Sequence, residues 1–444
     1  MSDLPPNGFS AVEAAQKIRE GWLTSVELVT ACLDRIEQTD GQLKAWAHLD
    51  KDYALAQAHS MDDIKMHGRA MGALHGVPVG LKDIIDTKSL PTECGTAIYK
   101  GRQPSGDATL VNRLKEEGAV ILGKTVSTEL AFVHPAQTSN PHNPEHTPGG
   151  SSSGSAAAVA GYHVPLAIGT QTNGSVIRPA SFCGTYGFKP SRGVISRTGL
   201  LQTSNSLDQV GVFGRSLEDV ALLSDAIGCY DPQDEKSFPH PRPKMLDGAQ
   251  EKAGIEPDIV WFDLPFADRL TQDSKDGFEE VLSALGDRVT RIQAPENFTG
   301  LLDTQRIIHE YEICLQQADI FDNHWDKISE TLQPVIERGR QISKDEYEYA
   351  LDVMGQTESF LKDFFLDYDA ILTPSSTGEA PLISSGGTGD PAFCTLWTLA
   401  GLPCVTLPLM VGSHGLPIGV QLVGGYEEDN RLLRTANWLL TELN

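Results

Sequence analysis

Residues 148–179 read PGGSSSGSAAAVAGYHVPLAIGTQTNGSVIRP, and this stretch decides the fold class. A Gly/Ser loop runs into a helix of small residues, and a β-branched run at 164–168 then predicts a strand. A Gly/Asn/Ser turn follows that strand and opens another helix. Short strands that alternate with helices in this way are typical of an α/β protein.

The same alternation continues on both sides of this stretch. From about Met71, short β-branched runs separated by Gly and Pro are interleaved with helical patterns. Two earlier helices are predicted by reciprocal caps, Ser10 with Glu13 and Thr24 with Glu27. We expect strands at 77–85, 119–122, 164–168, 370–373, 405–409 and 418–423, and helices at 108–117, 216–227 and 429–441.

The middle of the chain has a different character. Residues 231–254 are rich in Pro and charge, and residues 301–365 carry long helical patterns without strands. We therefore expect one domain over 1–444, with a core at about 65–230 and 369–444. A mainly helical lid or side region is expected at about 265–366.

Composition excludes a nucleic-acid binder and a disordered chain. The 444 residues include 35 Lys and Arg against 60 Asp and Glu, which gives a formal charge of −25. A chain this acidic repels phosphate unless a local basic patch reverses the field, and the sequence contains no such patch. Its 40% of hydrophobic residues is typical of a folded globular protein.

The chain ends and the cysteines bear on location and on metals. Residues 1–10 lack the basic and apolar regions of a signal peptide, and no run approaches the ~18 apolar residues that span a bilayer. We expect a cytoplasmic protein without membrane contact. The odd number of cysteines, with no CxxC pair and no zinc spacing, predicts reduced and mostly buried thiols and no metal site; they are Cys32, Cys94, Cys183, Cys229, Cys314, Cys394 and Cys404.

Two literal motif matches stand in the wrong context. Residues 118–125, GAVILGKT, match a phosphate-binding loop, but a helical pattern precedes them and their apolar interior predicts a strand. Residues 150–154, GSSSG, match the nucleophile elbow of α/β-hydrolases with Ser152 as nucleophile. That elbow requires a preceding strand, and the late histidine, His414, lies in a turn-like sequence. An esterase that uses Ser152 remains an alternative.

A serine nucleophile at neutral pH needs a base within hydrogen-bond reach. The histidines near this stretch are poorly placed for that role: His134, His142 and His146 lie in loop sequence, and His163 lies at the start of its strand. Lys82, in the apolar strand sequence GVPVGLKD, has flanks that favour burial. Burial lowers the pKa of a lysine from ~10.4 toward ~7 or 8, where the amine acts as a base.

The attack on a carbonyl also develops an oxyanion, which successive backbone N–H groups in a Gly-rich turn stabilise. The turn at 172–175, TNGS, leads into a helix and fits this need. Gly174 allows a close approach of the substrate.

These residues lie in blocks that resemble the amidase signature family. The blocks occur in family order and cover essentially the whole chain: 72–83, 123–132, 140–160, 165–196, 206–223, 399–409 and 415–424. The resemblance implies a large mixed central β-sheet covered by helices on both faces. It also implies a bacterial stand-alone amidase without a cofactor.

The resemblance assigns the catalytic roles residue by residue. The family's Ser-cisSer-Lys triad maps to Ser175 as nucleophile, Ser151 as the cis-serine relay and Lys82 as base. The two serines lie 24 positions apart, as in the family. The resemblance therefore implies Ser151 and not Ser152 as the relay, a choice that spacing alone does not make. The implied oxyanion donors are the backbone amides of Thr172, Asn173, Gly174 and Ser175.

The chain departs from the family pattern at three positions. Gln171 replaces an acid beside Arg178, which puts the partner of that arginine in doubt. Asn173 replaces a glycine and places a side chain at the mouth of the turn, where it contacts substrate or narrows the pocket. Ser153 replaces a glycine in the first block.

Function within the family is inferred from the segment 396–398, where Trp397 stands in place of a PVN-like stretch. A bulky indole favours a hydrolase of aryl or alkyl amides, extending to carbamates (urethanase-like) and esters. The alternatives are the glutamine-hydrolysing component of an amidotransferase and a non-catalytic binding protein. We expect a small amide or carbamate as ligand and leave a homodimer open. The residues expected to bind substrate or support the site are Ser152, Gln171, Arg178 and Trp397.

Overall fold

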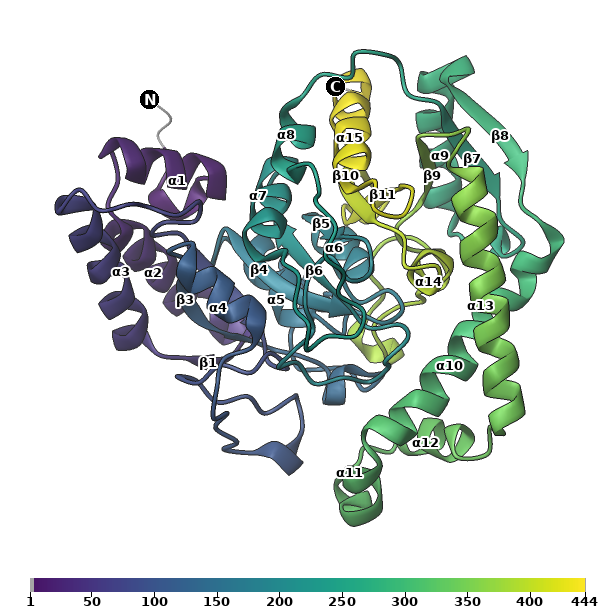
Figure 1. Cartoon of the computed structure of the whole chain (residues 1–444), viewed down its shortest axis with the longest axis horizontal. Helices are drawn as coiled ribbons and strands as arrows, with labels where there is room; N and C mark the ends of the chain where they lie inside the picture. Colours follow the sequence, from purple (N-terminus) through teal and green to yellow (C-terminus); the bar gives the residue numbers. More distant parts are fainter. Residues whose placement is uncertain (1–3, 444) are drawn as a thin grey trace.

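A single mixed β-sheet of eleven strands runs through the part of the chain that the structure, a computed structural model, describes, residues 4–443 (Figure 1). Its strand order is β1-β3-β2-β4-β6-β5-β10-β11-β9-β7-β8. The strands are β1 Trp46–Leu49, β2 Pro78–Lys82, β3 Val120–Thr125, β4 Leu166–Gln171, β5 Tyr186–Lys189, β6 Gln209–Gly214, β7 Ile259–Asp263, β8 Val289–Gln293, β9 Ala370–Pro374, β10 Cys404–Val411 and β11 Pro417–Val423.

Strand β2 lies between β3 and β4 and runs parallel to both. Leu81 of β2 pairs with Ile168 of β4, so the carboxyl ends of these strands meet at the same edge of the sheet. Strands β7, β8 and β9 are also parallel to one another, whereas the remaining neighbours are antiparallel. Ligands of α/β proteins bind beyond the carboxyl ends of such strands.

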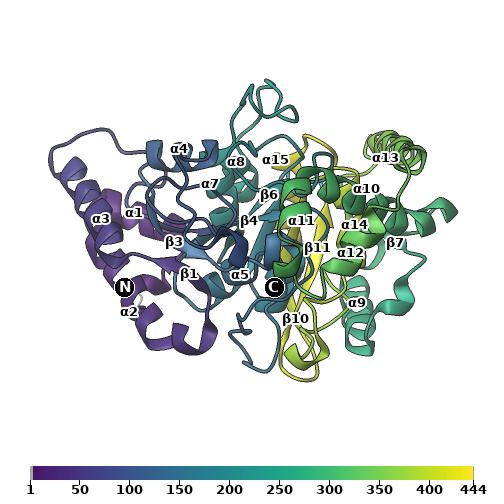
Figure 2. The ribbon, with the colours of Figure 1, turned by 90° about the horizontal axis from the view of Figure 1, so that it is seen from below.

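Helices cover both faces of this sheet, as the resemblance implies (Figure 1 and Figure 2). Successive residues of a strand point to opposite faces, and both faces of β3 are buried. Ile121 packs in one apolar cluster with Leu114 of α4, while Val120 and Leu122 pack in another with Val29 of α2. The helices are α1 Ala11–Glu20, α2 Ser25–Leu43, α3 Lys51–Met66, α4 Thr109–Glu116, α5 Ser153–Ala160, α6 Ile177–Cys183, α7 Leu217–Ile227, α8 Met245–Gln250, α9 Gln272–Leu285, α10 Leu301–Gln316, α11 Ala318–Asn323, α12 Gln333–Gly339, α13 Lys344–Phe364, α14 Ala392–Leu399 and α15 Asp429–Leu443.

The long helices of the middle region gather at one end of the molecule. Figure 1 shows α10 to α13 on the side opposite α1, α2 and α3. The Pro- and charge-rich residues 231–254 behave differently, because their one helix, α8, packs against α7 and α15. Of the helices α10 to α13, α10 and α12 line the large cavity described below.

The six expected strands are present, with shifted ends. The expected strand at 77–85 ends at Lys82, because the backbone N–H groups of Ile84 and Ile85 turn back to the carbonyl of Lys82. The strand expected at 164–168 is β4, which begins two residues later and extends to Gln171. The carboxyl end of β4 therefore reaches the turn at 172–175 directly.

Five strands lie outside the sequence-based expectation, namely β1, β5, β6, β7 and β8. For three of them the sequence signal is weak. Strand β1 is short and lies at the sheet edge, and β5 and β6 contain glycines, which lower the propensity for strands. Strand β8, at the other edge, falls inside the region expected to be mainly helical and is largely exposed. Tertiary pairing forms these strands where local patterns are weak.

The local predictions at the N-terminus and for the cysteines agree with the structure. Both reciprocal caps are present at the starts of α1 and α2. Every cysteine is free, and five of the seven are buried. Within the described residues, no helix combines the length and apolar character needed to cross a bilayer.

Candidate active site

Lys82, the last residue of β2, is fully buried. Its Nζ atom lies 2.7 Å from Oγ of Ser151 and 2.9 Å from Oγ1 of Thr170. Burial lowers the pKa of Lys82 to about 7, against the opposing effect of the negative charge of Asp208. A lysine with this pKa is largely unprotonated just above neutral pH and acts as a base.

Ser151 lies two residues before α5 and is almost completely buried. The peptide bond between Gly150 and Ser151 is cis. The carbonyl of Ser151 accepts a hydrogen bond from the backbone N–H of Thr128 over 3.1 Å. The Ser151 hydroxyl thus occupies a defined position beside the Lys82 amine, as the resemblance implies for the relay residue.

Ser175 lies in the turn between β4 and α6 and is partly exposed on a cavity. Within residues 4–443 its hydroxyl makes no hydrogen bond, and the backbone N–H groups of Thr172, Asn173, Gly174 and Ser175 have no partner either. Free N–H groups in a turn that leads into a helix suit a developing oxyanion.

Gln171 holds the far side of this turn. Its Oε1 accepts hydrogen bonds from the backbone N–H groups of Val176 and Ile177, over 2.8 and 3.0 Å. Its Nε2 donates to Oγ1 of Thr398 over 2.9 Å. The side chain is fully buried, so these three hydrogen bonds fix the start of α6 relative to β4 and α14.

Arg178 makes no hydrogen bond to Gln171 or to a carboxylate within residues 4–443. Its guanidinium donates to the carbonyl of Gly150 over 2.6 Å, to the carbonyl of Gly389 and to Oγ1 of Thr388 over 3.1 Å. Burial lowers the pKa of Arg178 to about 10. The arginine therefore ties the Gly150–Ser151 peptide to the loop at 387–391.

A cavity of about 470 Å³ opens in front of Ser175. Its walls come from residues 131–133, the turn at 172–175, helices α10 and α12, the loop at 387–391 and the start of α14. Many of the lining side chains are charged, and all but one of the arginines are paired with carboxylates; the charged set is Arg178, Arg269, Arg306, Arg338, Asp303, Glu310 and Asp390.

Asn173 bridges two walls of this cavity. Its Oδ1 accepts a hydrogen bond from Oγ1 of Thr395 on α14 over 2.6 Å, and its Nδ2 donates to Oε1 of Gln305 on α10 over 3.1 Å. Gln305 in turn donates to the carbonyl of Thr172 over 3.0 Å. The residue that replaces the family glycine therefore holds the turn between the two helices and also narrows the cavity.

The structure corrects the expectation for Trp397. This side chain is fully buried in the apolar cluster around α14 and is not among the residues that line the cavity. Helix α14 presents Thr395 to the cavity and turns Trp397 by about 200° away from it, since successive helix residues are spaced by ~100°. This indole therefore gives no support to the inference of an apolar or aromatic substrate.

Ser152 is also fully buried, and its hydroxyl contacts the backbone N–H and carbonyl of Thr170, both over 3.3 Å. It makes no hydrogen bond to a histidine within residues 4–443, which removes support for the Ser152 esterase. The other motif match also lacks its context, because residues 120–125 form β3.

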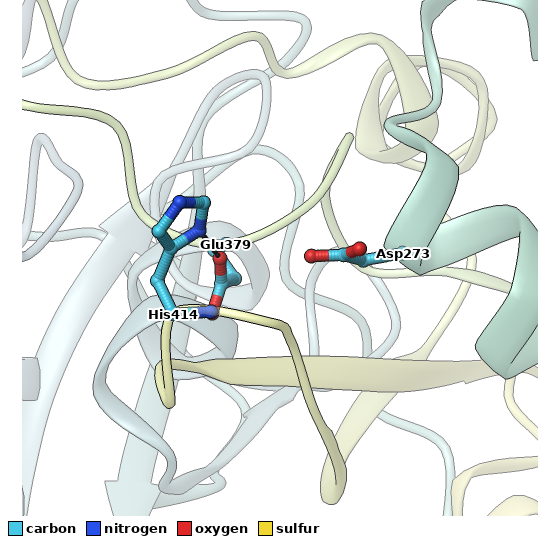
Figure 3. Close-up of side chains that lie close together, drawn as sticks. All are labelled: Asp273, Glu379 and His414. Atoms are coloured by element: carbon cyan, nitrogen blue, oxygen red, sulfur yellow. Dashed lines mark hydrogen bonds and ion pairs between the residues drawn. The ribbon is translucent and has the colours of Figure 1, made fainter.

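Figure 3 shows one group of three side chains in the described residues, Asp273, Glu379 and His414, that has metal-ligand spacing. None of the three lines the cavity. The ligand atoms of Asp273, Glu379 and His414 lie within 4.8 Å of one another. Both carboxylates already have donors: Asp273 accepts from Ser413, and Glu379 accepts from His414 and from the backbone of Leu416. These bonds hold the turn between β10 and β11.

The comparison with known families decides the classification. A family model described as Amidase matches residues 27–433. The chain belongs to the amidase family. Among the relatives of this amidase, a glutamyl-tRNA(Gln) amidotransferase subunit from Microcystis aeruginosa is 34% identical over 93% of this chain and 93% of its own length.

Solved structures support the amidase fold. A chain from a vestigial protein complex, described as revealing the origins of an s-triazine catabolic enzyme, is 27% identical with a TM-score of 0.91 and covers 98% of both chains. The native peptide amidase from Stenotrophomonas maltophilia is 27% identical with a TM-score of 0.85, over 98% of this amidase and 97% of that chain. The α/β amidase signature fold is thereby confirmed.

The sequence analysis missed four polar residues at the amidase site, namely Thr170, Asp208, Gln305 and His309. Thr170 holds Lys82, and Asp208 lies in a family block without an assigned role. Gln305 and His309 lie on α10, where the family resemblance is weakest. Their spacing of four residues places them on one helix face, and this is the one local signal that the sequence offers.

Proposed function

We propose that this amidase hydrolyses the C–N bond of carboxylic amides through an acyl-enzyme on Ser175. The observation that supports it most strongly is the 2.7 Å contact between the buried amine of Lys82 and the hydroxyl of Ser151. The buried lysine is half-deprotonated near neutral pH and lies beside one serine, and the cavity exposes a second serine. These are the groups that a proton relay to a serine nucleophile requires.

In the first half of the reaction, neutral Lys82 accepts the proton of Ser151, and Ser151 accepts the proton of Ser175. The Ser175 oxygen attacks the carbonyl carbon, and the free N–H groups at 172–175 stabilise the oxyanion. The relay then returns the proton to the amine as the C–N bond breaks. A general base contributes about 10²- to 10⁴-fold to such a step, and an oxyanion donor about 10²- to 10³-fold.

In the second half, water attacks the acyl-enzyme. The relay removes one proton from the water, and the bond between the acyl carbon and Ser175 breaks. The carboxylic acid leaves, and Ser175 regains its proton. Carbamates and esters pass through similar tetrahedral intermediates, so the same residues serve both.

Covalent labelling tests the nucleophile. A fluorophosphonate is expected to modify the protein at one site, Ser175, with one equivalent bound, as mass spectrometry of the digested protein measures. The Ser175→Ala variant is expected to take up no label, and the Ser152→Ala variant is expected to keep it. Absence of labelling in the unmodified protein would favour a non-catalytic binding protein, and a label on Ser152 would favour the esterase.

The cavity combines apolar side chains such as Leu302 and Val335 with charged and polar ones, which supports an amide that carries hydrogen-bonding groups as substrate. Arginine and carboxylate side chains lie on several of its sides, and the burial of Trp397 removes the argument for an aromatic one. Specific polar side chains around a largely preformed cavity select for hydrogen-bonding groups on the ligand.

A second candidate is glutamine hydrolysis within an amidotransferase, in which partner chains use the ammonia. The relative from Microcystis aeruginosa, which is named as an amidotransferase subunit, supports this candidate at 34% identity. Ammonia release from glutamine, from simple primary amides, from p-nitroanilides and from carbamates separates the two. Turnover restricted to glutamine would favour the amidotransferase.

A further inference from the structure

His309 lies on α10 in the wall of the cavity and is partly exposed to it. Its ring contacts the ring of Phe132, with centroids 4.3 Å apart. Its Nε2 atom lies 3.2 Å from Oγ1 of Thr203. Gln305, one helical turn earlier, contacts the turn that contains Ser175, and His309 and Ser175 line the same cavity.

The protonation pattern of His309 follows from the residues behind it. Asp208 accepts four hydrogen bonds, from the hydroxyls of Thr172 and Thr203 and from the backbone N–H groups of Thr203 and Ser204. The Thr203 hydroxyl has one proton and gives it to the carboxylate, because a charged acceptor binds more strongly than a neutral ring nitrogen. The contact between Thr203 and His309 therefore requires a proton on Nε2.

A neutral imidazole with its proton on Nε2 carries a lone pair on Nδ1. Desolvation of the largely enclosed ring lowers the pKa of His309 below its usual value, so the neutral form predominates at physiological pH. Nδ1 makes no hydrogen bond to any residue from 4 to 443 and is not fully buried. Because His309 lines the cavity, we infer that this lone pair faces it.

We propose that Nδ1 of His309 is a fixed hydrogen-bond acceptor for an N–H group of the substrate, so that the cavity selects amides that carry such a donor. This inference rests on the proposed function. The donor comes from one of two sources, the N–H of the scissile amide or an amino group on the acyl part. A histidine that can change its tautomer would pair with either a donor or an acceptor on the substrate. The contact with Thr203, which donates to Asp208, fixes the tautomer of His309, so its Nδ1 pairs only with a donor.

Two substrate pairs distinguish these sources. Butyryl p-nitroanilide and p-nitrophenyl butyrate share the acyl and aryl parts, and the anilide alone has a scissile N–H. Glutamine and its des-amino counterpart, glutaramate, share the scissile amide, and glutamine alone has an amino donor. The variants are His309→Leu, which removes the acceptor, and His309→Asn, whose Oδ1 lies near the position of Nδ1.

In the pair that reports the true donor, His309→Leu is expected to lower kcat/KM about tenfold for the substrate that carries the donor, either the anilide or glutamine. A tenfold loss is the effect of one lost hydrogen bond. The member without the donor changes less than about twofold, which also shows that Ser175 and the fold are intact. The His309→Asn variant is expected to recover most of the loss.

Equal losses on both members of each pair, or no loss on any substrate, would overturn the role of His309 while leaving the proposed function standing. No turnover of any of the four substrates by the unmodified protein would overturn the proposed function and this inference together. If His309→Leu lowers the turnover of the donor-bearing member in one pair alone, and His309→Asn restores it, that pair identifies the source of the donor.

Discussion

The Nζ atom of Lys82 lies 2.7 Å from Oγ of Ser151, and both side chains are buried. The two residues are 69 positions apart in the sequence and come from the end of β2 and the segment before α5. Removal from water favours the neutral form of the amine, and proximity to a hydroxyl gives that form a proton to accept. The chemistry of the site therefore depends on this contact and on the groups that surround it.

Lys82→Met is expected to reduce kcat/KM about 10²- to 10⁴-fold, because the side chain keeps its volume and loses the base. Lys189 provides a matched control, since it is equally buried and donates to Gln209 and to the carbonyl of Leu402, away from the cavity lining. Lys189→Met is expected to lower stability while leaving the turnover of folded molecules unchanged. Full activity in Lys82→Met, measured on a p-nitroanilide, would contradict the relay.

The pH profile of kcat/KM is expected to rise with pH and level off above about 7, where Lys82 loses its proton. Burial lowers the pKa of a lysine, so the active, unprotonated form predominates above the pKa and is lost below it. In the acidic limb the rate is expected to fall about tenfold per pH unit. A profile that is flat from pH 5 to 8 would show that no such base acts.

Asp208→Asn is expected to move this acidic limb to lower pH. The negative charge of Asp208 favours the protonated amine, so its removal lowers the pKa of Lys82 further. Asp234, a buried carboxylate paired with Arg197, serves as the control, and Asp234→Asn is expected to leave the limb in place. A shift of the limb to higher pH in Asp208→Asn would be inconsistent with this account.

Gln171→Ala is expected to lower the free energy of unfolding by about 2 kcal/mol or more, because the backbone N–H groups of Val176 and Ile177 lose their acceptor while still buried. The start of α6 shifts with them, so kcat is expected to fall as well. Gln171→Glu retains the acceptor and is expected to lose less. Urea denaturation and p-nitroanilide turnover measure both effects; unchanged stability in Gln171→Ala would refute the contact.

Asn173→Gly is expected to cost about 1 kcal/mol of stability for each of the two hydrogen bonds it removes, to Thr395 and Gln305, as urea denaturation measures. A glycine in the turn also has greater backbone freedom. The free N–H groups are then held less firmly, so kcat is expected to fall more than KM rises. A variant with raised kcat would indicate that the Asn173 side chain obstructs the cavity instead.

Local patterns predict those elements whose signals are local. The caps at Ser10 and Thr24 are predicted correctly because each involves residues three positions apart. The strand that contains Lys82 is predicted too long at both ends, since apolar residues continue into the turn that follows it. Strands β1 and β8 at the sheet edges escape prediction because their neighbours in the sheet, and not their own residues, determine their pairing.

The same distinction holds for the site. Family blocks identify Lys82, Ser151 and Ser175 as candidates, and the structure brings the first two into contact and exposes the third on the cavity. The expectation for Trp397 is wrong, because sequence does not tell which face of α14 meets the cavity. The only sequence signal for His309 is its spacing of four residues from Gln305, because its partner Thr203 lies 106 positions away.

The sequence by itself determined the α/β class and the membership of the amidase family, and it supplied three candidates for a Ser-Ser-Lys relay. Tertiary structure alone decided the burial that neutralises Lys82, the interior position of Trp397, and the chain of contacts from Asp208 to His309. The physical reason is that backbone conformation depends largely on neighbouring residues, whereas pKa and cavity shape depend on which distant segments exclude water from a group.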